Sequence, residues 1–74
     1  MNKWISVDIR LPEDNRLKII RYADVWNGKE SFLGIKLDRY SIPSNMDRKI
    51  WGLEFSNPRL RVTHWADLPE GYEE

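Results

Sequence analysis

The chain has 74 residues, no cysteine and one histidine, and its 12 basic residues balance its 12 acidic residues to a formal net charge of zero. This length allows one small domain. The lack of cysteine excludes disulfide bonds and thiolate chemistry, and one histidine is too few for a typical zinc site, so no cofactor and no metal are predicted. A neutral chain also exerts no long-range attraction on nucleic acid or on anionic membranes.

Apolar segments in the chain are short. No apolar run approaches the roughly 20 residues of a membrane span, and no apolar signal core follows the first residues. A cytosolic protein without a membrane partner is therefore predicted.

The chain alternates between strand-like and turn-like stretches. Alternating or β-branched stretches predict strands at residues 1–7, 16–26, 31–40, 49–55 and 60–65. Stretches rich in Pro, Asn, Asp and Ser predict turns at residues 8–15, 41–48 and 56–58. This spacing is typical of a mainly β protein, with a small antiparallel sheet of three to four strands. The first stretch, a strand or an extended arm, is expected to lie beside the last strand.

A hairpin is predicted between the second and third strand stretches. Asn27 and Gly28 separate two apolar runs, and a type I′ turn needs positive φ at both central residues. Before the turn, the adjacent pair Ile19 and Ile20 interrupts the alternation, which indicates either a bulge or a strand covered on both faces.

The return strand of this hairpin is expected to supply part of the core. Alternation places Leu33, Ile35 and Leu37 on one face, which we expect to point inward. Further along, the loop residues 44–48 allow one short helical turn. Residues 49–55 alternate again, and we expect them to form a strand.

The predicted domain covers residues 1–69. Residues 70–74 are mostly acidic, and we expect them to form a frayed tail.

Two similar motifs mark the ends of the domain. Trp-Ile-Ser-Val precedes Leu-Pro-Glu near the start, and Val-Thr-His-Trp precedes Leu-Pro-Glu near the end. The signature residues are Trp4, Leu11, Pro12, His64, Trp65, Leu68 and Pro69. With these motifs the chain resembles a family of domains of unknown function from small proteins of tailed bacteriophages and prophages. The resemblance implies an accessory protein in the cytoplasm of a bacterial host, and it implies no chemistry.

The resemblance is confined to the ends of the chain. Ala66 and Asp67 stand where the resemblance leads one to expect Met and Pro, and residues 40–55 have no counterpart in it. A surface specific to a partner is therefore predicted in residues 40–55.

The excess of aromatic side chains suggests a protein interface. A core this small has limited room, and exposed aromatic residues mark interaction surfaces. The candidates are Trp26, Tyr40, Trp51 and Phe55. The alternative is that all four belong to the core.

The single histidine and the acidic residues near the ends are interpreted as structural. We expect His64 to hydrogen-bond across the N-terminal arm and fix its register, with Trp4 and Trp65 packed where the two ends meet. The acids could form a metal or acid–base site only if the ends meet, and their spacing matches no metal loop, so solvated turn acids are predicted. They are Asp8, Glu13, Asp14, Asp67 and Glu70.

Basic residues on two predicted strands offer an alternative function. With neighbouring aromatic rings, a basic stripe would suit single-stranded nucleic acid, whereas an ordinary charged solvent face is the simpler interpretation. The stripe would consist of Arg16, Lys18, Arg21, Arg59 and Arg61.

The leading hypothesis is a non-enzymatic phage accessory protein. It would bind a host or phage protein and self-associate through an aromatic or edge-strand surface. The alternative is a nucleic-acid-binding phage regulator, and a small enzyme that depends on His64 is the third hypothesis.

Overall fold

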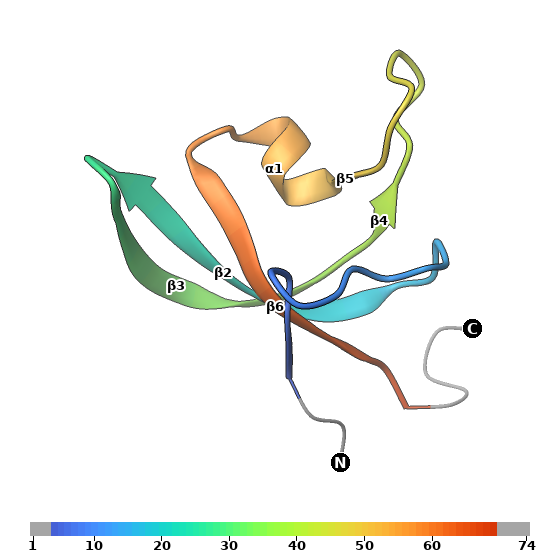
Figure 1. The fold of residues 1–74 in the computed structure, drawn as a ribbon, viewed down its shortest axis with the longest axis horizontal. Coiled ribbons are helices and arrows are strands. Elements are labelled where there is room, and N and C mark those ends of the chain that lie inside the picture. Colours follow the sequence, from blue (N-terminus) through green and yellow to red (C-terminus); the bar gives the residue numbers. More distant parts are fainter. Residues whose placement is uncertain (1–3, 70–74) are drawn as a thin grey trace.

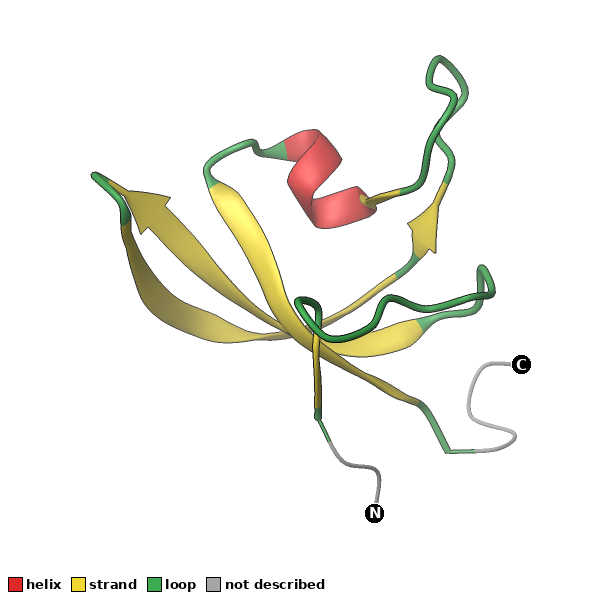
Figure 2. Ribbon diagram, viewed as in Figure 1, coloured by secondary structure: helices red, strands yellow, loops and turns green. Residues whose placement is uncertain are grey.

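The chain folds around a four-stranded antiparallel sheet in a computed structural model that describes residues 4–69 (Figure 1). The strand order is β1-β6-β2-β3. These strands are β1 (Ile5–Ser6), β2 (Lys18–Trp26), β3 (Lys29–Asp38) and β6 (Leu60–Asp67). Figure 2 shows the remaining elements on one side of the sheet. They are β4 (Tyr40–Ser41), which pairs with β5 (Ile50–Trp51), and helix α1 (Gly52–Ser56). The predicted mainly β fold is confirmed.

The hairpin between β2 and β3 turns at the predicted residues. Asn27 has φ 54° and Gly28 has φ 75°, the positive values that a type I′ turn requires. The bulge predicted at Ile19 and Ile20 is not found there. The register shifts instead at residues 21–23 of β2. There the extra residues are Leu33 in β3 and Thr63 in β6, and β2 itself stays regular.

The two ends of the domain meet in the sheet, as expected. Ile5 of β1 lies opposite Trp65 of β6, and Ser6 lies opposite His64. The backbone N–H of Val7 extends this pairing by donating to the carbonyl of Thr63 at 3.0 Å.

The core forms on one face of the sheet. Ile20 lies opposite Trp65, so the two side chains share this face, and the buried Val62 joins them. Trp51 covers them from β5 and is only 2% exposed. The helix and the β4–β5 pair therefore lie over this face.

The predicted inward face of β3 is wrong. Leu33, Ile35 and Leu37 are 51%, 53% and 44% exposed. Ile35 and Leu37 lie opposite Arg21 and Ile19, which share the face opposite to the core. No described element covers that face, since the helix packs on the other one.

The predicted strand at 49–55 is also wrong beyond its first residues. Only Ile50 and Trp51 pair, and the chain then turns into α1. The helical turn allowed at 44–48 is instead a loop, in which the N–H of Met46 donates to the carbonyl of Pro43 at 3.2 Å.

Contacts with distant strands hold α1 in place. The Asp38 carboxylate accepts a hydrogen bond from the Leu53 N–H at 2.7 Å, which satisfies a donor of the first helical turn. The Glu54 carboxylate accepts one from the Val62 N–H at 2.8 Å, where β6 extends past β1. Spacing within residues 49–55 gives no sign of either contact.

Candidate interaction surfaces

The structure separates the four aromatic residues predicted as an interface. Trp26, at the hairpin tip, is 61% exposed and Phe55, on α1, is 53% exposed. Trp51 is buried in the core, and the Tyr40 ring packs on it with centroids 5.1 Å apart. Trp51 therefore does not belong to an exposed aromatic surface, because its ring completes a core that is too small without it.

The predicted basic stripe is largely neutralised by acids in the fold. Arg59 pairs with Asp24 at 3.0 Å. Arg61 pairs with Asp8 at 3.1 Å and with Glu30 at 2.8 Å. These residues do not present a row of uncompensated cations.

Two further members of the stripe, Arg21 and Lys18, lie on different faces. Arg21 lies on the face opposite to the core, with its guanidinium 5.9 Å from the Trp4 ring centroid and 4.7 Å from that of Phe32. Lys18 is buried on the core face instead. The structure therefore does not join the two into one phosphate-binding surface.

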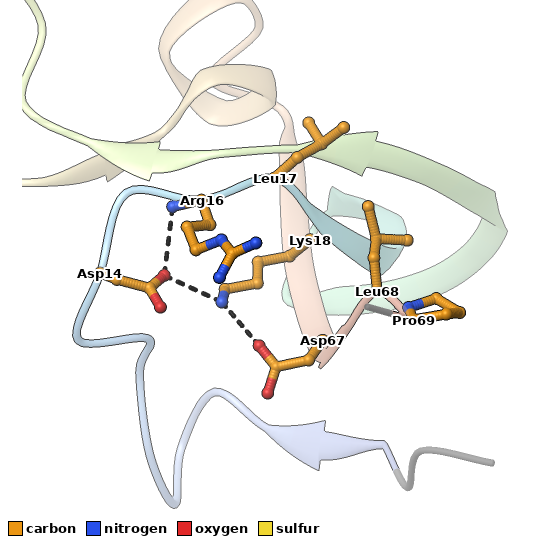
Figure 3. Close-up of a pocket in the computed structure, with 7 residues that line it drawn as sticks. All are labelled: Asp14, Arg16, Leu17, Lys18, Asp67, Leu68 and Pro69. Carbon is orange, nitrogen blue, oxygen red and sulfur yellow. Dashed lines mark hydrogen bonds and ion pairs between the residues drawn. The ribbon is translucent and has the colours of Figure 1, made fainter. Parts of the chain in front are cut away.

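Lys18 is the one buried charged residue within residues 4–69, and its ammonium group lies between two carboxylates (Figure 3). Its Nζ is 2.9 Å from Asp14 Oδ1 and 2.6 Å from Asp67 Oδ1. The same nitrogen lies 5.5 Å from the centroid of the Trp65 ring. A cavity of about 360 Å³ opens beside it, and the signature residues Leu68 and Pro69 line one side. This cluster joins the start of β2 to the end of β6.

The cluster changes the pKa values of its members. Burial by itself would lower the pKa of Lys18, but hydrogen bonds to Asp67 and Asp14 outweigh it and raise that pKa above the ordinary value. The hydrogen bond from Lys18 is the main reason that the pKa of Asp14 is lowered. Both groups are thus held in their charged forms, which suits a structural ion cluster.

The signature residues at the two ends join without forming the predicted tryptophan pair. The indole N–H of Trp65 donates to the carbonyl of Arg10 at 2.9 Å, and Pro12 is buried nearby. Trp4 precedes Ile5, which faces Trp65, so alternation places Trp4 on the opposite face of the sheet. The two tryptophan rings therefore lie on different faces.

Within residues 4–69, the His64 side chain makes no hydrogen bond to the N-terminal arm, so it does not fix the register of that arm. Its Nδ1 lies 2.9 Å from Thr63 Oγ1, which in turn donates to the carbonyl of Arg21 at 3.3 Å. The register is instead set by backbone pairing, with His64 opposite Ser6.

The acids near the ends pair with basic residues. Asp14 and Asp67 hold Lys18, and Asp8 holds Arg61. Glu13 is exposed, and Glu70 lies outside the described residues. Within residues 4–69, no three His, Asp or Glu side chains gather as a metal site would require. No helix in the same range is long and apolar enough to cross a membrane.

One face of the sheet carries a cluster of partly exposed apolar side chains. We call it the apolar sheet face, and it consists of Trp4, Ile19, Phe32, Ile35 and Leu37. Register places Ile35 and Leu37 opposite Arg21 and Ile19, and the Arg21 guanidinium contacts the rings of Trp4 and Phe32. On monomeric proteins, clusters of this kind mark interaction sites.

A second candidate surface is a cavity on the core side of the molecule. Its volume is about 320 Å³. Residues from the stretch 40–55 form much of its wall, and the N-terminal motif and β6 supply the rest. We call it the lateral pocket, and its lining is Val7, Leu11, Tyr40, Arg48, Lys49, Ile50, Trp51, Glu54, Arg61 and Val62.

Comparison with family models identifies the family of this chain. The model of a family described as "Protein of unknown function (DUF551)" matches residues 3–71. The chain belongs to this family. The matched range includes residues 40–55, so the lateral pocket lies inside the family domain. No curated protein and no solved structure matches the chain.

Sequence reasoning missed the role of Lys18 as a buried ion-cluster residue. A lysine at the start of a β-branched strand is an ordinary surface residue by composition, and lysines are rarely buried. The sequence offered one signal for this role. Asp14 and Asp67 each stand near a Leu-Pro pair, and the two ends of the chain were expected to meet.

Proposed function

We propose that this member of the family is a non-enzymatic bacteriophage accessory protein that acts in the host cytoplasm as a homodimer and binds a host or phage protein. The phage setting is supported by the paired end motifs, Trp4 with Leu11-Pro12 and Trp65 with Leu68-Pro69. The dimer is supported by the apolar sheet face, which is the observation that carries the proposal.

The area of this face fits a second copy of the chain. Phe32 and Ile35 are more than half exposed, and Trp4 and Leu37 are close to 40% exposed. These side chains leave on the order of 400 Å² of apolar surface per copy. Since interfaces are about 56–65% apolar, two copies packed face to face would bury roughly 1,300 Å² in total, which is within the range of specific interfaces.

The apolar sheet face is a better dimer surface than the free edge of β3. The bulge at Leu33 interrupts the register in the middle of that edge strand. Bulges and lysines on edge strands act against pairing with another chain, and β3 also carries Lys29 and Lys36. Self-association is therefore assigned to the face and not to the edge.

A role without catalysis is supported by the setting of His64. Its Nδ1 contacts the Thr63 hydroxyl, and no acid among residues 4–69 is in hydrogen-bond contact with the ring. A general base of the usual kind is oriented by such an acid.

The dimer is tested by sedimentation equilibrium of the wild type and of Ile35→Lys. We expect a twofold mass for the wild type at high micromolar concentration and a monomer mass for the variant, because a buried lysine ammonium would face the second copy unpaired.

The matched control is Ile42→Lys. Ile42 is 55% exposed, as Ile35 is 53% exposed, but it lies in the loop after β4 and outside the apolar sheet face. We expect this control to remain a dimer. A wild type that is monomeric throughout, or equal loss of mass in both variants, would contradict the dimer.

A further inference from the structure

The lateral pocket combines an apolar floor with a basic rim. Val7, Leu11 and the Tyr40 ring supply apolar surface, and Arg48 and Lys49 stand together at the rim. The pocket draws on both ends of the chain and on the stretch 40–55, so it exists only in the folded domain.

The two basic residues of the rim make no ion pair with an acid among residues 4–69. Arg48 makes no ion pair with any described residue, and its side chain is exposed. Within residues 4–69, the Lys49 ammonium makes one polar contact, to the backbone carbonyl of Glu13 at 3.4 Å, and it lies 5.9 Å from the Tyr40 ring centroid. The neighbouring Asp47 forms no ion pair with either of them among residues 4–69.

The other charged residues of the pocket are already engaged. Arg61 is held by Asp8 and Glu30, and the Glu54 carboxylate accepts the Val62 N–H. The amide N–H does not neutralise the Glu54 carboxylate, so the pocket keeps one negative charge, and its two cations without an acid partner among residues 4–69 are Arg48 and Lys49 at the rim.

A buried donor lies in the wall of the same pocket. Trp51 is 2% exposed, and its indole Nε1 has no hydrogen-bond partner among residues 4–69. Leaving a buried donor unpaired costs roughly 1–3 kcal/mol. Trp51 lines the lateral pocket, so a ligand in the pocket that reached the indole N–H would supply the missing acceptor.

From these observations we infer that the lateral pocket binds an acidic peptide segment of a partner protein. A carboxylate side chain contacts Arg48 and Lys49, and an adjacent apolar side chain occupies the floor. This inference rests on the proposed protein-binding function and names the chemistry of the partner. It places partner binding away from the apolar sheet face, so dimerisation and peptide binding are separate properties.

The geometry favours a peptide over single-stranded nucleic acid. Nucleic acid is bound along a track of several cations, whereas the pocket offers two that are free of acids. Zero net charge also provides no long-range field that would attract a polyanion. One or two carboxylates beside an apolar side chain match the pocket better.

The probe is a capped hexapeptide with two glutamates that flank a phenylalanine and a leucine, titrated into ¹⁵N-labelled full chain. The measurement follows the Trp51 indole N–H signal, assigned with Trp51→Phe. We expect saturable binding and a downfield shift of that signal as the donor gains an acceptor. The double variant Arg48→Glu and Lys49→Glu should bind at least tenfold more weakly.

Two controls separate this inference from the proposed dimer. Lys29→Glu, at the hairpin, should leave peptide affinity within twofold, and the dimer variant Ile35→Lys should still bind the peptide. The inference is overturned if the folded wild type does not bind, or if a peptide with glutamine in place of glutamate binds equally well. Binding of a thymidine oligonucleotide in place of the peptide would overturn the assigned partner class.

Discussion

At the scale of single residues, the fold depends on one buried lysine between two exposed acids. Lys18 side-chain exposure is 4%, whereas Asp14 and Asp67 are 53% and 64% exposed. The asymmetry matters because a buried charge without partners is costly, while carboxylates that lose the lysine remain hydrated. The ion cluster is therefore more sensitive to loss of the acids than to loss of the base.

Neutralising both acids should destabilise the protein more than removing the lysine. For the double variant Asp14→Asn and Asp67→Asn we expect a loss of about 2–3 kcal/mol in the free energy of unfolding, because the ammonium stays buried and unpaired. Lys18→Met keeps the apolar stem and should cost about 1 kcal/mol or less. Urea unfolding gives both values, and an equal loss would contradict the asymmetry.

The stability of the same cluster should depend on pH. The folded pKa of Asp14 is below its unfolded value, so its contribution is present above about pH 4 and is lost as pH falls through the folded pKa. The folded pKa of Lys18 is raised, so its contribution is present below about pH 10.4 and is lost as pH rises through the folded pKa. In Asp14→Asn, the free energy of unfolding should fall less steeply between pH 5 and pH 2 than it does in the wild type. An unchanged pH dependence would count against the cluster.

At the scale of elements, the short helix owes its existence to tertiary caps. Asp38, at the end of β3, accepts the Leu53 N–H, and Glu54 of the helix reaches the Val62 N–H in return. A five-residue helix is far too short to be stable alone. Its position is thus decided by the strands on either side of it.

Gly52 is required where α1 meets β3. A Cβ at this position would lie 2.7 Å from Asp38 Oδ1, an atom that the Arg39 N–H holds at 2.8 Å. Gly52→Ala should therefore destabilise by about 1–2 kcal/mol, although alanine favours helices by about 1 kcal/mol over glycine. Thermal unfolding measures the effect.

A second background makes this prediction specific. In Asp38→Ser the carboxylate is absent, so adding Gly52→Ala should cost less than it does in the wild type. Ser56→Ala, at the exposed end of the same helix, is the matched control and should change stability by less than about 0.5 kcal/mol. A Gly52→Ala variant as stable as the wild type would exclude the clash.

At the scale of the whole molecule, the sheet has one covered and one uncovered face. The helix and the β4–β5 pair fill the face that carries Ile20, Val62 and Trp65. The apolar sheet face has no described element over it. This two-layer arrangement leaves a small domain with half of its sheet available for a second copy.

The apparent stability should consequently depend on protein concentration. A partner that binds only the folded state raises the midpoint of unfolding by mass action. We expect the wild-type Tm to rise between low and high micromolar concentration and the Tm of Ile35→Lys to stay constant. Differential scanning calorimetry at two concentrations checks this, and a constant wild-type Tm would speak against the dimer.

The sequence alone determined the local and periodic features of this protein. The Asn27-Gly28 turn could be predicted because type I′ geometry is a property of two residues, and β2 and β6 could be predicted because alternation and β-branching act within one strand. The meeting of the two ends followed from their paired motifs.

Only the tertiary structure decided which face of the sheet is the core, where the helix lies and what surrounds Lys18. Alternation makes Leu33, Ile35 and Leu37 a common face but cannot say whether another element covers it. The contacts of Asp38 and Lys18 join residues 15 and 49 positions apart. Long-range contacts of this kind leave no periodic signal in the chain, so the lateral pocket and the ion cluster appear only when the strands are assembled.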